Sequence, residues 1–153
     1  PSKSRCHPVC IQLINSGDWL QMDTWPPRSF RAEMFLTADQ GLRWHRADLE
    51  DSRRTTIDYT YDASRPTPSA GGPSFSLWNA GSKNQFFIER RDRTDLVLFT
   101  APPSEAEIEV VGDVRAILYI STSATKSLDV IARLCSVSRL GFSHNICEGV
   151  TRV

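Results

Sequence analysis

Hydrophobic and polar residues alternate in short runs along much of this chain of 153 residues. A period of two places every second side chain on one face, as in a strand that buries only one of its faces. Helical spacing is weak by comparison, so the pattern predicts a protein built from strands. The alternating runs cover residues 30–36, 57–61, 108–110, 114–120 and 130–137, and a short apolar run covers 95–100.

Proline and glycine clusters separate these runs, at residues 25–27, 65–68, 71–73 and 102–103. Many short strands divided by such clusters predict a β-sandwich or barrel rather than alternating strands and helices. Residues 63–83 contain few alternating positions, which predicts a long loop. Long ordered loops on a β scaffold are common places for a binding surface.

Composition excludes several classes of protein. The 18 Lys and Arg residues balance 18 Asp and Glu residues, so the basic excess of a nucleic-acid binder is absent. No apolar run approaches the ~20 residues of a membrane helix. The cysteines are too few for a disulfide framework, which favours a reducing, cytoplasmic compartment. They are Cys6, Cys10, Cys135 and Cys147.

Motifs for catalysis are poor. Residues 141–145 come closest to the G-x-S-x-G nucleophile motif but lack its final glycine, so Ser143 is predicted to be a polar residue at a turn. Cysteine and histidine at residues 6–10 and 144–147 have spacings unlike those of common zinc sites. Signatures for dinucleotide and phosphate binding are missing. The sequence therefore predicts no catalytic residue, metal or cofactor in this chain.

Three tryptophans lie in or beside loops rich in glycine and proline: Trp19, Trp25 and Trp78. Aromatic residues on loops either cover the core beneath the loop or contact a ligand or partner. If they contact a ligand, stacking on a sugar face is one mechanism, and these three residues are its candidates.

Arg133 is the only charged residue in the run 130–137. Alternation places it on the same face as Ile131 and Cys135. Unless that face is solvated, Arg133 is expected to pair with a carboxylate, because a buried charge without a partner is costly. Asp129, four residues earlier and on the same face, is a candidate partner.

Several signatures, in order along the chain, resemble one known family. The resemblance is to the C-terminal domain of the cocaine-esterase-like and X-prolyl dipeptidyl-peptidase serine hydrolases. It implies a jelly-roll β-sandwich of the galactose-binding type, packed on an α/β-hydrolase domain that carries a Ser-Asp-His triad outside this chain. The matching residues include Trp25-Pro26-Pro27, Tyr59-Thr60-Tyr61-Asp62, Pro66, Pro68, Gly71-Gly72, Arg93, Asp95, Ala132-Arg133-Leu134 and the closing stretch from Gly141 to Arg152. Asn84-Gln85 stands where the family usually has Asp-Gln.

The resemblance also suggests a domain organisation. Residues 1–27 are expected to be the end of a preceding region or a linker, and residues 28–153 a jelly-roll domain that stops before its last strands. The expected partners are the catalytic domain of the same protein and a small ester, amide or peptide substrate. Exposed strand edges left by a truncation would favour a homo-oligomer.

The leading functional hypothesis is an accessory domain that walls the acyl pocket of a serine hydrolase. Phe75, Leu77 and Trp78 follow the Gly-Gly pair and are the predicted pocket or domain-interface contacts. Alternatively, these residues cover the core of this domain. The other functional hypotheses are a free-standing carbohydrate-binding module and a purely structural or oligomerising domain. On all of these hypotheses the chain alone has no hydrolase activity.

Overall fold

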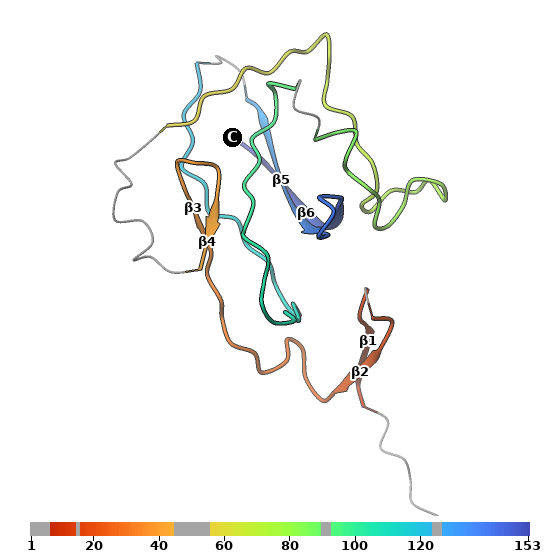
Figure 1. Cartoon of the computed structure of the whole chain (residues 1–153). Helices are drawn as coiled ribbons and strands as arrows, with labels where there is room; N and C mark the ends of the chain where they lie inside the picture. The colour runs from red at the N-terminus through yellow and green to blue at the C-terminus, as the bar shows by residue number, and fades with distance from the viewer. Residues whose placement is uncertain (1–6, 15, 45–55, 90–92, 124–126) are drawn as a thin grey trace, which may run out of the picture. The chain divides into compact units, whose positions relative to one another are not determined.

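A computed structural model describes residues 7–14, 16–44, 56–89, 93–123 and 127–153. Within these ranges the regular elements are strands, with no helix, and they form three antiparallel hairpins (Figure 1). The all-β class predicted from the alternation is therefore confirmed. The strands are β1 (Val9–Gln12), β2 (Trp19–Met22), β3 (Phe35–Leu36), β4 (Leu42–Arg43), β5 (Asp129–Val137) and β6 (Ser143–Arg152).

The chain forms two compact units. The first contains Pro1–Glu33 and Glu105–Ile117, and the second contains Met34–Ser104 and Leu118–Val153. The β1–β2 hairpin belongs to the first unit, and the other two hairpins belong to the second. The predicted domain boundary after residue 27 stays a prediction.

The β5–β6 hairpin is the longest element. Its ladder runs from Asp129 opposite Arg152 to Val137 opposite Ser143, with a bulge between Leu134 and Cys135. The strand predicted over residues 130–137 is therefore confirmed.

The β3–β4 hairpin is short, and its turn contacts a distant segment. The amide of Leu42 donates to the carbonyl of Thr100, and the amide of Thr100 donates to the carbonyl of Gln40, both at 3.0 Å. Thr100, the last residue of the apolar run 95–100, therefore connects that run to the β3–β4 turn.

Most of the other predicted strands are not observed as ladders. Residues 57–61, 108–110 and 114–120 form no strand in the described part of the chain, and the run 30–36 yields only β3. Alternation reports which side chains share a face, whereas a ladder also needs a second strand in register. The jelly-roll topology accordingly stays a prediction.

Burial in the described residues is concentrated in the second unit and is largely polar. Ile88 is the one apolar side chain in the buried class there, beside four buried polar residues: Thr37, Gln85, Ser143 and Asn145. Because buried polar groups need hydrogen-bond partners, these residues indicate a specific network. The described ranges also contain no helix long and apolar enough to cross a bilayer.

Candidate functional site

A closed loop of the second unit, residues 72–81, is the candidate site. Its ends form an antiparallel bridge, in which the Gly72 amide donates to the Gly81 carbonyl at 2.8 Å and the Gly81 amide donates back at 3.0 Å. Inside the loop, the Ser76 carbonyl accepts bonds from the amides of Asn79 and Ala80, at 3.0 and 2.8 Å. The backbone of the 72–81 loop is therefore held by its own hydrogen bonds.

The predicted site residues project from this loop into solvent. Phe75 and Leu77 are fully or almost fully exposed, at 108% and 94%, and Trp78 is 91% exposed. The 72–81 loop contains no charged residue. All three side chains are uncharged, largely apolar and exposed in the described part of the chain.

Two glycines begin the loop in a conformation that other residues rarely adopt. Gly71 and Gly72 have φ angles of +80° and +78°. A Cβ atom on Gly71 would lie 2.4 Å from the carbonyl oxygen of Gly81, and one on Gly72 would lie 2.7 Å from Oε1 of Glu148. Backbone conformation therefore favours glycine at both positions, and the nearby Gly81 carbonyl adds a packing requirement at Gly71.

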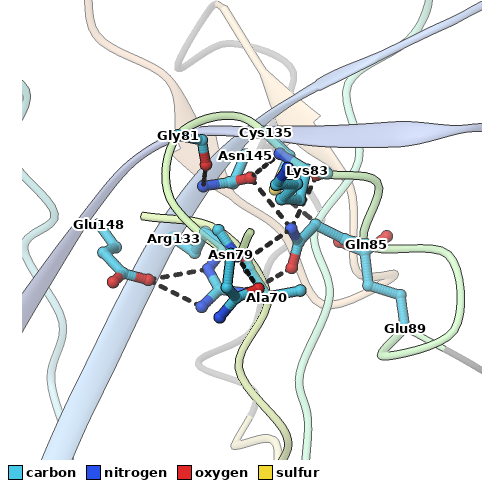
Figure 2. A network of polar contacts seen from close by, with 11 residues as sticks. Ala70, Asn79, Gly81, Lys83, Gln85, Glu89, Arg133, Cys135, Asn145 and Glu148 are labelled. Atoms are coloured by element: carbon cyan, nitrogen blue, oxygen red, sulfur yellow. Dashed lines mark hydrogen bonds and ion pairs between the residues drawn. The ribbon is translucent and has the colours of Figure 1, made fainter. Parts of the chain in front are cut away.

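A buried amide pair supports the base of the loop (Figure 2). Gln85 is fully buried, and its Nε2 donates to the carbonyls of Ala70 and Lys83, at 3.0 and 2.8 Å, and to Oδ1 of Asn145 at 3.0 Å. Asn145, 3% exposed, accepts the Lys83 amide at 2.7 Å and donates from Nδ2 to the Gly81 carbonyl at 3.3 Å. Both ends of the 72–81 loop are thus tied to one pair of side chains.

Arg133 of β5 connects this pair to β6. Its Nε and Nη2 donate to Oε2 of Glu148 at 3.0 and 2.7 Å, and its Nη1 donates to Oε1 of Gln85. We call Gln85, Arg133, Asn145 and Glu148 the polar hub. Figure 2 shows Arg133 between Glu148 and Gln85, at the base of the loop.

The expectation that Arg133 pairs with a carboxylate is confirmed, but the candidate partner, Asp129, is wrong. Asp129 pairs with Arg152 at 2.7 Å. Four residues along a strand separate two Cα atoms by about 13 Å, whereas Glu148 lies directly opposite Arg133 in the ladder. Cross-strand neighbours depend on register, which the sequence of one strand does not contain.

Ser143 is a structural residue. Its side chain is buried at the start of β6, and its hydroxyl donates to the carboxylate of Glu89. The thiol of Cys135 contacts the same carboxylate, at 3.8 Å between Sγ and Oε1. Burial, and then the negative charge of Glu89, raises the pKa of Cys135 to about 11. A thiol with this pKa is a poor nucleophile at neutral pH.

The other candidate aromatic residues are also exposed. Trp19 on β2 is 63% exposed and Trp25 is half exposed, and both belong to the first unit. The cysteines in the described ranges, Cys10, Cys135 and Cys147, are free thiols, and Cys6 lies outside the described residues. Exposure alone does not select a ligand for any of these residues.

The polar hub was not predicted as a unit. Gln85, Asn145 and Glu148 lie within signatures that carried the family resemblance, but their separation in the sequence concealed that they meet. One signal in the sequence could have indicated the hub residues: they are polar residues within stretches that are otherwise expected to be buried. Their common role at the base of the 72–81 loop depends on the tertiary structure.

Comparison with known proteins assigns this β-rich chain to a class of accessory domains. Residues 4–153 match the family described as X-Pro dipeptidyl-peptidase C-terminal non-catalytic domain. The chain belongs to this family, as the resemblance predicted. It is therefore a C-terminal non-catalytic domain of the kind found in X-Pro dipeptidyl-peptidases and related esterases.

Two relatives illustrate the relationship. "Cocaine esterase" of a Rhodococcus species (strain MB1 Bresler) is 33% identical over 96 residues, which is 62% of this chain and 16% of that protein. "Putative serine esterase Mb1866c" of Mycobacterium bovis is 25% identical over 122 residues, which is 77% of this chain and 18% of the relative. The aligned region is thus less than a fifth of the length of either relative. No solved structure matches the chain.

Proposed function

We propose that this chain is the accessory domain of a serine hydrolase and that its 72–81 loop packs on an α/β-hydrolase domain of the same protein. In this proposal the reaction is cleavage of an ester or an amide, X-Pro peptides included, through an acyl-enzyme. The nucleophile and the oxyanion donors belong to the catalytic domain. A jelly-roll sandwich of the galactose-binding type is the proposed scaffold.

The observation that carries the proposal is the exposure of Phe75, Leu77 and Trp78 on an anchored loop. Their almost full exposure supports a contact to a partner over a role in covering the core of their own domain. Burying one large apolar side chain contributes about 1.5–3 kcal/mol. Three such side chains on a loop fixed at both ends have the character of an anchor in a partner's pocket.

The chemistry of the loop suits an acyl pocket. A wall that excludes water strengthens the electrostatic interactions that stabilise the tetrahedral intermediate. The 72–81 loop brings no charge that would compete with those interactions or repel an apolar acyl group. We therefore expect the loop to select uncharged acyl groups by shape.

The test uses the longer polypeptide that carries the catalytic domain. Trp78→Ala should lower kcat/KM for esters with bulky acyl groups by about tenfold or more and have less effect on acetyl esters, since pocket contacts discriminate by this order. Tyr119→Ala is the control, because Tyr119 is equally exposed but lies outside the loop. If Trp78→Ala weakened the association of the two domains without changing acyl selectivity, the role of the loop would be limited to the domain interface. Unchanged kinetics and association would overturn the proposal.

A carbohydrate-binding function is not favoured. The matched family is described as a non-catalytic domain of a dipeptidyl-peptidase, and the relatives are named as esterases. Exposure of Trp19, Trp25 and Trp78 is the observation in favour of sugar stacking, and it fits contacts to a protein partner equally well.

A further inference from the structure

We propose that the polar hub positions the 72–81 loop and thereby sets its acyl-group selectivity, with Glu148 and Arg133 as positioning residues. This inference rests on the proposed function. It concerns side chains on β5 and β6 that do not belong to the apolar surface of the loop. Their role would be to fix the positions of the Phe75, Leu77 and Trp78 side chains.

The polar hub lies against both ends of the 72–81 loop. Oε1 of Glu148 lies beside Gly72, in the space that a side chain there would enter: a Cβ atom built on this glycine would lie 2.7 Å from it. Asn145 binds the carbonyl of Gly81, the residue that closes the loop. The hub therefore touches both partners of the bridge that defines the loop.

The members of the polar hub are also hydrogen-bonded to one another. Arg133 binds Glu148 through two N–H groups and Gln85 through a third, and Gln85 in turn binds Asn145. In the described residues no buried side-chain nitrogen or oxygen lacks a partner. A fully satisfied buried network is rigid, because displacing one member leaves the others unpaired. Moving the loop would thus require several hydrogen bonds to break together.

The β5–β6 hairpin contains two cross-strand ion pairs that differ in burial. Arg133–Glu148 and Arg152–Asp129 are both ion pairs between residues directly opposite each other on β5 and β6. The first pair is largely buried, at 20% and 18% exposure, whereas the second is exposed, at 72% and 45%. Exposed pairs contribute little to structure, and truncation of a buried pair has large effects. The second pair is therefore a matched control for the first.

The first experiment measures backbone hydrogen exchange in this chain by NMR. Glu148→Gln removes the charge, and Arg133→Lys keeps the charge but loses the forked guanidinium. Both variants should accelerate exchange at the Gly72 and Gly81 amides about tenfold or more. Asp129→Asn should leave these two amides unchanged. The amides of Leu128 and Val153, which bond to each other's carbonyls at the open end of the hairpin, report whether the variant is folded.

The second experiment measures kinetics in the polypeptide that carries the catalytic domain. Glu148→Gln should raise KM for bulky acyl esters about tenfold and leave kcat for an acetyl ester within about twofold, whereas Asp129→Asn should change neither. A general loss of folding would lower the amount of active enzyme without this split between KM and kcat. The split therefore separates positioning from stability.

The outcomes distinguish this inference from the proposed function. Unchanged exchange at Gly72 and Gly81 in both hub variants would overturn the inference. The inference would also be overturned by a second combination of results. In that case Trp78→Ala alters acyl selectivity, whereas Glu148→Gln accelerates exchange in the loop but leaves acyl selectivity unchanged. If Trp78→Ala had no effect on kinetics or association, the proposed function would fail, and hydrogen exchange alone would then decide the positioning role. If Glu148→Gln also lost protection at Leu128 and Val153, Arg133→Lys would decide.

Discussion

Gly71 shows how strongly single residues constrain the candidate site. Its φ angle is +80°, and the space that a side chain would occupy is filled by the Gly81 carbonyl and by Asn145. Gly81 has a similar φ angle of +78°, yet no atom lies within 4 Å of the position of its Cβ. The two glycines therefore share a backbone requirement and differ in packing.

This difference gives a prediction for Gly71→Ala compared with Gly81→Ala. The left-handed conformation costs any other L-residue about 1–2 kcal/mol, and both variants should lose that much stability. Gly71→Ala should lose a further ~1–3 kcal/mol, because the new methyl group collides with backbone and amide atoms. Urea unfolding followed by circular dichroism measures both. Equal losses would show that the contacts around Gly71 can relax.

At the scale of elements, side chains connect segments that share no ladder. Asp95 binds Nε of Arg93 at 2.8 Å and accepts a hydrogen bond from Thr67, while Arg93 donates to the carbonyl of Arg65 at 3.1 Å. These bonds fix the turn near residue 65 to the segment that begins at residue 93. Hydrogen bonds from Arg93 and then Thr67 lower the pKa of Asp95 from 3.8 to about 2.

The lowered pKa of Asp95 predicts an acid-dependent loss of stability. The folded state favours the ionised carboxylate, so its contribution is complete above pH 3.8 and is lost as the pH falls towards 2. Asp95→Asn should lower stability at neutral pH and reduce the slope of unfolding free energy against pH between about 4 and 2. Asp58→Asn, at an exposed carboxylate of the same unit, is the control. An unchanged slope in Asp95→Asn would contradict the prediction.

At the scale of the whole chain, large apolar side chains are exposed well beyond the 72–81 loop. Examples are Phe30, Phe87, Ile117 and Leu140, each more than 70% exposed. Apolar surface of this extent is typical of a protein that is covered by a partner. The family assignment to a non-catalytic domain is consistent with a large neighbouring domain as that partner.

The chain by itself should therefore bind a dye specific for apolar surface and self-associate. We expect size-exclusion chromatography with light scattering to detect species larger than a monomer, and anilinonaphthalene sulfonate fluorescence to rise on addition of the chain. The polypeptide that includes the catalytic domain should bind less dye per molecule. A monomer that binds no dye would show that the exposed residues are covered within the chain.

Sequence alone determined the class of the fold and the family. Alternation identified β5, because a half-buried strand shows a period of two whether or not its partner is known. Ordered signatures located the glycine pair and the apolar residues of the 72–81 loop. The same alternation overpredicted strands at residues 57–61 and 114–120, since a ladder depends on a second strand that the local pattern does not specify.

Only the tertiary structure decided which polar residues meet. Asp129 and Glu148 were both carboxylates available to Arg133, and the register of β5 against β6 placed Glu148 opposite it. Gln85 reaches the same guanidinium from 48 residues away. Contacts of this kind depend on the folding of distant segments onto each other, so the sequence supplied the members of the polar hub while the fold determined their partners.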